Sequence, residues 1–474
     1  MAELKKSLGP VQFFSFGFGM IVGVGWIVYM GLWFNQAGPV GTTLAFLIGG
    51  LLMALVGLCY AEVSSMYPVA GGEAAYAFGA LGRVAAFAVG WAMVLMMIAV
   101  VPYVSVSLAW ILDYLVPGIG GPVLYRWRGQ PIHALGLAIA MAYAAWLGFV
   151  NYRGIQAAAK FQDWLTYGKI AISFLFIGAG VFGGSTANLE PMFQVSPSGS
   201  ALGGMIAVIA TTPWFFGGFN SIPQAFEERA PNTSPRTLGL IVVGSILAAA
   251  AYYALAALSA GMVGPWQQIV KEDLPVAAAF RMAFGSELFS RIVLVAGLFG
   301  IITVGNAASI AATRLLFAMG RARMITPAFT RLHPSFRSPV VAIVFVTAFG
   351  MLGNFLGRGG IAPIVNVGSA AAAFAYLVTS LSVWRLRHIE PDQPRPYRMP
   401  AGVAISFLAA AGSIFLLFSS LRQHWIDGGR GFPLEWVVIV VWGVVGALMW
   451  RAAAAERATL APGEQRRIIL GEST

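Results

Sequence analysis

Five glycines interrupt the apolar segment GFGMIVGVGWIVYMG at residues 17–31. A glycine weakens a helix by about 1 kcal/mol relative to alanine, so this segment needs a reason for its composition. One reason is packing, because Gly19 and Gly23 form a G-x-x-x-G pair that lets membrane helices approach closely. The other is binding: if Gly23, Val24 and Gly25 leave helical geometry, their N–H and C=O groups face a ligand within a cavity.

A second interruption favours binding over packing alone. The segment AVIATTPWFFGGFNSIPQAFEERAPN begins at residue 207 and contains Gly217-Gly218 and then Pro223. Transporters built from inverted repeats carry such interrupted segments at matching places in their two halves. The match predicts a pair of discontinuous helices that meet near the middle of the membrane.

Lys169 is an ionisable residue inside an apolar run, DWLTYGKIAISF, where it shares a helical face with Thr166 and Ser173. Such a residue is a functional candidate. The residues alone leave a second explanation open, in which the ammonium reaches an interface roughly 10 Å away. For Arg314, also inside an apolar run, we expect a structural role near the end of its helix.

The remaining polar residues give little sign of catalysis. The four histidines lack metal-ligand spacing, and no His, Cys or paired-carboxylate cluster of the kind a membrane-embedded enzyme needs is evident. A soluble output domain, as in a sensor, is also absent. We therefore expect no cofactor, no metal and no enzymatic activity. Glu62, Glu73, Glu227 and Glu228 are expected to form solvated or gating ion pairs rather than to carry protons.

The elements that position these residues are membrane spans. The 474 residues are 58% hydrophobic and 10% charged, against roughly 25% charged in soluble domains. Runs of about 20 apolar residues predict an all-α integral membrane protein with about twelve spans, at 11–34, 39–64, 82–113, 131–150, 161–183, 200–225, 235–262, 286–320, 338–357, 361–384, 402–421 and 433–452.

Charge predicts the orientation of these spans. The net charge of +11 comes from basic residues that punctuate the apolar runs, which argues against nucleic-acid binding. Most of the 29 Lys and Arg residues fall on the side of the N-terminus, so we expect a cell-membrane protein with both termini cytoplasmic. The stretch PWQQIVKEDLP (265–275) is expected to be a solvated external link, and 453–474 a polar, mobile cytoplasmic tail.

Several motifs in the right order resemble the amino acid–polyamine–organocation (APC) superfamily of secondary transporters. They are GMIVGVGWI (19–27), PVAGGEAAYAFGALG (68–82), WFFGGFN (214–220) with Glu227-Glu228 and PNTSPR after it, NAASIAATRLLFAMGRA (306–322), RLHPSFRSPV (331–340) and RPYRMP (395–400). The resemblance implies a LeuT-like fold of two inverted five-helix repeats, 11–183 and 200–384. Helices 1 and 6 would be discontinuous, and 402–452 would add two peripheral helices.

The resemblance also implies a substrate site. A half-helix N-terminus suits a carboxylate, which would meet Gly23, Val24 and Gly25. The substrate's ammonium group would meet the carbonyls of Ile21, Trp214 and Gly217. The side-chain pocket or its gate would be formed by Trp26, Ile27, Phe215, Phe216 and Phe219. Lys169, in a T-x-x-K pattern, resembles the lysine whose ammonium replaces sodium, which implies proton coupling.

Two departures from the family pattern bear on the substrate. Val24 and Trp26 make the first motif bulkier than usual, which favours a small or thin substrate side chain. Asn220 stands where an acidic residue is common, which removes a candidate proton carrier. Since no acidic residue falls beside the two interruptions, a neutral substrate is favoured.

The sequence therefore predicts alternating-access transport of a small neutral amino acid or close analogue, driven by protons across the lipid bilayer. An amine or polyamine carrier and an amino acid exchanger stay open within the fold, whereas an enzyme, sensor or channel fits poorly. The G-x-x-x-G face leaves a homodimer open.

Overall fold

The computed structural model describes residues 9–471 except 70, 154–158, 196–198, 225, 227–228 and 427–428. Within this part, eleven helices are long and apolar enough to cross a membrane. In chain order the elements are α1 Pro10–Ile21, α2 Gly25–Val28, α3 Met30–Met66, α4 Gly72–Leu81, α5 Arg83–Leu115, β1 Val123–Trp127, β2 Gln130–His133, α6 Ala134–Arg153, α7 Ala159–Gly183, η1 Thr186–Leu189, α8 Ala201–Ile209, α9 Thr212–Phe216, η2 Gly217–Asn220, α10 Ser221–Gln224, α11 Pro235–Met262, α12 Trp266–Ile269, α13 Pro275–Phe284, α14 Glu287–Arg321, η4 Pro327–Thr330, α15 Val340–Asn354, η5 Arg358–Gly360, α16 Ile361–Ile389, α17 Gly402–Ile426, α18 Leu434–Ala452, α19 Ala454–Ala458 and α20 Pro462–Leu470.

The expected span at 338–357 is shorter in the structure than a membrane-crossing helix needs to be. It forms α15, an apolar helix of 15 residues. At 1.5 Å per residue this helix is about 22 Å long, shorter than a hydrocarbon core of about 30 Å. The expected first and second spans run into each other in α3, where Gly38 adopts a positive φ of 72° just before Pro39.

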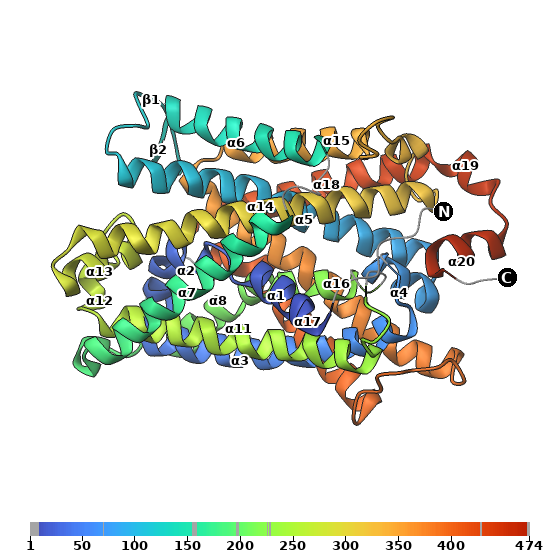
Figure 1. Ribbon diagram of the computed structural model, residues 1–474, viewed down its shortest axis with the longest axis horizontal. Coiled ribbons are helices and arrows are strands. Elements are labelled where there is room, and N and C mark those ends of the chain that lie inside the picture. The colour runs from blue at the N-terminus through green and yellow to red at the C-terminus, as the bar shows by residue number, and fades with distance from the viewer. Residues whose placement is uncertain are drawn as a thin grey trace.

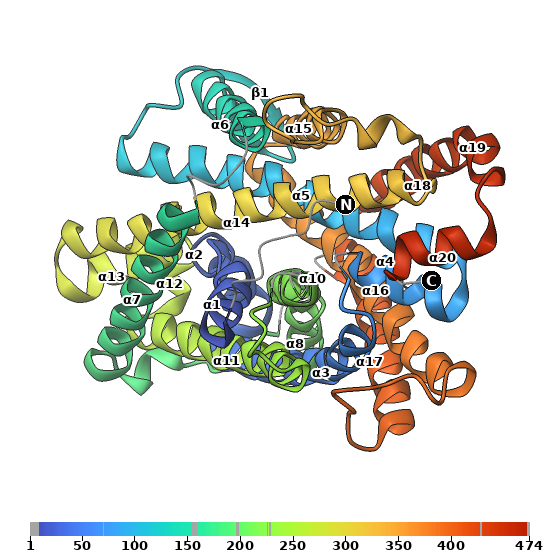
Figure 2. The ribbon, with the colours of Figure 1, turned by 45° about the vertical axis from the view of Figure 1, so that its right-hand side comes forward.

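The long helices run side by side along the longest axis of the molecule (Figure 1). One end carries β1, β2, α12 and α13 and is called the hairpin end below; the other carries α4, α19 and α20 and is called the α20 end. Turned by 45°, the ribbon shows α1, α8 and α10 in the centre of the bundle (Figure 2). Around them lie α3, α5, α7, α11, α14 and α16. The two interrupted segments are thus enclosed by continuous helices.

Three links are more ordered than expected. Residues 123–133 form an antiparallel hairpin that the sequence analysis did not anticipate. The stretch 265–275, expected to be solvated, forms α12 and leads into α13; Trp266 in α12 is 2% exposed and Leu274, just before α13, is 0% exposed. The chain beyond Ala452 forms α19 and α20, and α20 packs against α4 with Ile469 and Leu470 buried. The hairpin is held by local backbone pairing, whereas the other two segments bury apolar side chains.

Candidate functional site

The two predicted interruptions meet backbone to backbone. Helix α1 ends at Ile21 and α2 starts at Gly25, so Val22 to Val24 form the break. The second segment tightens from α9 into the 3-10 turn η2, which begins at Gly217. A Cβ on Gly218 would lie 2.5 Å from the Ile21 nitrogen and 2.6 Å from the Met20 carbonyl carbon. Only a glycine lets these two main chains approach so closely.

A cavity of about 50 Å³ lies at this meeting point. Of the residues predicted for the site, those that line it are Ile21, Gly23, Val24, Gly25, Trp214, Phe215 and Gly217. Further walls come from three helices that the sequence analysis did not connect with the site: Met96, Met97, Val100, Tyr103 and Val104 on α5, Tyr253 on α11, and Val304 and Ala308 on α14. No charged side chain is among the described residues that line it.

Four predicted site residues point elsewhere. Successive side chains of a helix diverge by about 100°, so the neighbours of the cavity-facing residues turn towards other helices. Trp26 packs against Phe176, and Ile27 approaches Gly297 on α14. Phe216 packs near Phe46 on α3, and Phe219 lies between Tyr60 and Tyr376.

The first break carries unpaired hydrogen-bond donors, and two of the residues that bear them, Val24 and Gly25, line the cavity. Among the described residues, the backbone N–H groups of Val24, Gly25 and Trp26 have no hydrogen-bond partner. Two of the three predicted ammonium acceptors are already engaged: the Ile21 carbonyl accepts from Gly23 N–H and from the Tyr253 hydroxyl at 2.9 Å. Likewise the Trp214 carbonyl accepts from Gly217 N–H. The site as it stands is therefore better prepared for an anionic group than for a cationic one.

Tyr103 adds a side-chain donor. Its hydroxyl is buried, has no partner in the described part of the chain, and lies 3.3 Å from where a Cβ on Gly25 would sit. A buried hydroxyl without a partner is costly and marks a place where a ligand would supply the missing bond. No local signal in the apolar run of α5 distinguishes Tyr103 from its neighbours, which is why the sequence analysis missed it.

The Lys169 side chain connects three helices, α7, α1 and α14, close to the first break. Its side chain is 1% exposed, so the ammonium does not reach an interface. It donates to the Gly19 carbonyl of α1 at 2.5 Å and to the Thr303 hydroxyl of α14 at 2.9 Å. The ammonium therefore ties α7, on which Lys169 lies, to both the interrupted helix and α14.

Glutamates at the α20 end make two different kinds of contact. Glu62, fully buried on α3, forms the expected ion pair, with Arg387 at 2.6 Å. Glu73 does not: it is also buried, and in the described part of the chain it meets the neutral side chains of Tyr60, Asn220 and Gln224. Glu227 and Glu228 lie outside the described residues.

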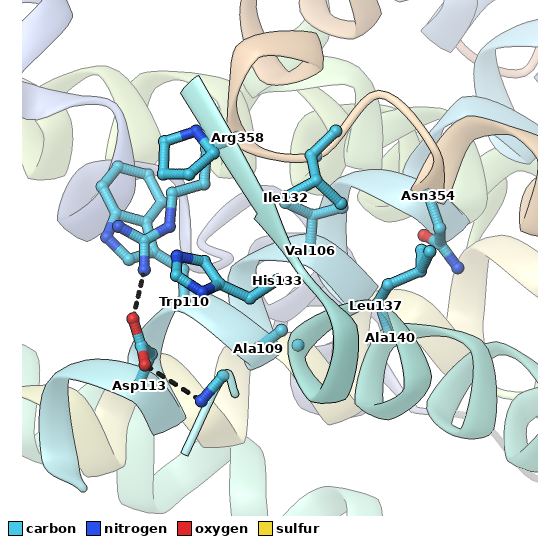
Figure 3. A pocket seen from close by; sticks show the side chains of 14 residues that line it. Val106, Ala109, Trp110, Asp113, Ile132, His133, Leu137, Ala140, Asn354 and Arg358 are labelled. Atoms are coloured by element: carbon cyan, nitrogen blue, oxygen red, sulfur yellow. Dashed lines mark hydrogen bonds and ion pairs between the residues drawn. The ribbon is translucent and has the colours of Figure 1, made fainter. Parts of the chain in front are cut away.

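An ion cluster joins helices at the hairpin end (Figure 3). Arg358 donates to Asp113 on α5 at 3.0 Å and to Asp273, in the link before α13, at 2.9 Å. The indole of Trp110 donates to Asp273 at 3.0 Å and lies under the guanidinium. A second cavity of about 50 Å³ is lined in part by Trp110, Asp113, His133 and Arg358. Polar contacts thus bridge the helices at both ends of the bundle.

Comparison with known proteins gives consistent matches over nearly the whole chain. Residues 8–449 match the sequence model of the amino acid permease family. The branched-chain amino acid permease BcaP of Bacillus subtilis (strain 168) is 26% identical over 457 residues, which cover 94% of this chain and 93% of the relative. The methylthioribose transporter of the same organism is 27% identical, with 94% and 93% covered. The chloroplastic cationic amino acid transporter 9 of Arabidopsis thaliana is 31% identical, with 70% and 58% covered.

Proposed function

The chain belongs to the amino acid permease family, a family of membrane transporters and not of enzymes, and from this premise we propose that it carries a small neutral amino acid. The observation that supports the substrate class most directly is the pairing of three unpartnered N–H groups with the Tyr103 hydroxyl. Together they offer several donors to one carboxylate, and hydrogen bonds to a charged acceptor are about twice as strong as neutral ones.

The size and polarity of the cavity narrow the substrate further. A water molecule needs roughly 10–15 Å³ of such space, so about 50 Å³ accommodates only a small substrate side chain without rearrangement. Apart from Tyr103, the walls facing the two breaks are apolar side chains of α5 and α14. A cationic side chain placed there would lack a counter-charge, which would cost several kcal/mol.

We infer that Lys169 couples transport to protons. Loss of its proton removes the charge that strengthens the hydrogen bonds from Lys169 to α1 and α14, and so weakens the hold on α1. Protonation and the position of α1 would then depend on each other. In this scheme 11–183 and 200–384 act as inverted repeats, the hairpin end faces outward, and the α20 end faces the cytoplasm, as the distribution of basic residues favours.

A second candidate substrate has a specific observation behind it. One relative is a methylthioribose transporter that matches over 93% of its own length, and the thioethers of Met96 and Met97 line the cavity, where they would suit a sulfur-containing ligand. Such a sugar has no carboxylate, so it would leave the N–H groups of the first break unpaired. The two substrates therefore make opposite demands on the same donors.

Sodium-free uptake into proteoliposomes tests the proposal. Pooled labelled neutral amino acids and labelled methylthioribose are offered separately, with and without an inward proton gradient. Gradient-driven accumulation of an amino acid that is lost in Gly25→Leu is the expected result. Accumulation of methylthioribose alone would replace the substrate. Gradient-independent exchange alone would refute proton coupling.

A further inference from the structure

The Glu73 carboxyl is an unusual buried group at the α20 end. Its side chain lies on α4, is 1% exposed, and accepts hydrogen bonds from three elements. Oε1 accepts from Asn220 Nδ2 of η2 at 2.7 Å and from the Tyr60 hydroxyl of α3 at 3.2 Å. Oε2 accepts from Gln224 Nε2 of α10 at 3.3 Å. The carboxyl therefore joins the interrupted second segment to α4 one turn below the cavity-lining Gly217.

Glu62 shows what this carboxyl lacks. It is equally buried at the same end, but Arg387 binds both of its oxygens at 2.8 and 2.6 Å, and Arg395 lies 3.5 Å away. A buried carboxylate with such partners keeps its charge. In the described part of the chain Glu73 has neutral donors only, so an ionised Glu73 would be a buried charge without a counter-ion.

Among the described residues, no element packed against Glu73 supplies a compensating charge. The titratable groups facing it are the phenols of Tyr60, Tyr76 and Tyr376. The helices packed against α4 carry other charged groups at this end, and no ion pair joins any of them to Glu73: Glu62 on α3, Arg83 on α5, Arg385, Arg387 and His388 on α16, and Glu464, Arg466 and Arg467 on α20. Burial accordingly raises the pKa of the Glu73 carboxyl.

We propose that Glu73 is a proton-binding site whose occupancy holds the α20 end of the transport path closed. In the closed state Glu73 is protonated, and one oxygen of its neutral carboxyl still accepts hydrogen bonds from Asn220 and Tyr60. A rotation of the Gln224 amide places its own oxygen opposite the carboxyl O–H. When η2 and α10 move away from α4, water reaches the carboxyl, and its proton passes to the solution at the α20 end. Closing takes one proton back from that solution.

This mechanism sets the sign of the pH dependence. The closed state binds one more proton than the open state, so acid favours closure and the open fraction grows as pH rises. The midpoint is the pH at which half of the molecules are open at the α20 end. Below it the open fraction increases up to about tenfold per pH unit, because one proton leaves per opening. The inference rests on the proposed transport function, since only a transporter needs this end to open.

The test measures access to a cysteine beside the contact. Ser221 on α10 is 6% exposed and follows Asn220 directly, and Ser221→Cys changes its volume little. In a Cys59→Ser background, labelling by N-ethylmaleimide is followed in proteoliposomes between about pH 5 and 8, and each rate is divided by that of a free thiol at the same pH. We expect the normalised rate to rise with pH in this parent variant.

Two changes to the contact decide the matter. Glu73→Gln keeps the shape but cannot ionise, so labelling should stay slow and independent of pH. Asn220→Asp places a second carboxyl against Glu73, so that the two share a proton and one pKa of the pair is strongly raised, which should move the midpoint of labelling upward by about 1 pH unit or more. Glu62→Gln, the matched control at a paired carboxyl, should lower stability and leave the pH profile in place.

Each result has one meaning. A Glu73→Gln variant that keeps the parent profile overturns the inference, and so does an Asn220→Asp midpoint within about 0.3 unit of the parent. If Glu73→Gln does not fold, the Asn220→Asp midpoint alone decides. Uptake is measured on the same vesicles: uptake with a flat labelling profile refutes the Glu73 site, whereas a pH-dependent profile without amino acid uptake refutes the proposed substrate.

Discussion

Replacing Tyr103 by phenylalanine should weaken substrate binding without weakening the fold. In the substrate-free structure the hydroxyl is buried and has no partner among the described residues, a situation that costs about 1–3 kcal/mol. Phenylalanine keeps the ring, which packs against Trp214, and removes the unsatisfied group. The free energy of unfolding of the empty protein should therefore stay constant or rise.

The effect on binding has the opposite sign. A hydrogen bond from the hydroxyl to a substrate carboxylate contributes about 1.5–3 kcal/mol, so its loss should raise Kd by about 10- to 150-fold. Equilibrium binding of the labelled amino acid to purified protein, together with thermal unfolding of the empty protein, measures both effects. Opposite changes in the two quantities separate a ligand contact from a general loss of structure.

Tyr252→Phe is the matched control. Tyr252 on α11 also carries a buried hydroxyl, which meets the strict hydrogen-bond geometry with no described residue and lies near Ser173, but it does not line the cavity. As in Tyr103→Phe, the free energy of unfolding of Tyr252→Phe should stay constant or rise, but its Kd for the substrate should not change. A Tyr103→Phe variant that binds within about twofold of the parent would refute the role given to the Tyr103 hydroxyl, and equal losses in both variants would refute it as well.

Three further changes test other parts of the site. Gly25→Leu should abolish binding but not folding, because its Cβ would lie 2.3 Å from an aromatic ring; retained affinity in a monodisperse sample would contradict the site. Lys169→Ala should abolish proton-driven accumulation and spare substrate exchange, and an unchanged response to the gradient would return Lys169 to a structural role. Gly300→Ala should cost about 1–3 kcal/mol of stability by overpacking, since its Cβ would lie 2.9 Å from the Gly23 carbonyl carbon. Gly244→Ala, with open space around it, should have no such effect in the same thermal unfolding assay.

The positions of the two interruptions could be predicted because glycine and proline act locally. Gly23, Gly25 and Gly217 mark the breaks within a residue or two, whatever packs around them. The Lys169 ammonium was also identified from sequence, because any charge stands out in an apolar run. Its hydrogen-bond partners, Gly19 and Thr303, could be identified only from the three-dimensional structure.

What could not be predicted depends on contacts between distant segments. Helix α5 is apolar all round and largely buried, so no periodicity indicates that Tyr103 faces the cavity. Asn220 was interpreted as the loss of an acidic group, yet the carboxyl is present next to it on Glu73, 147 residues earlier in the chain. The order of α20 likewise depends on a surface of α4 that no local pattern describes.

The construction of the cavity from two kinds of wall has a consequence for redesign. Donors that belong to the main chain are nearly immune to mutation, because exchanging Val24 for another residue leaves its amide in place. The opposite wall consists of side chains such as Met96, Met97, Val100 and Val304, and each can be exchanged without touching a break. A change of cargo is therefore best sought by diversifying these four positions as a small library, selected for growth on alternative nutrients, with both interruptions kept as the fixed frame.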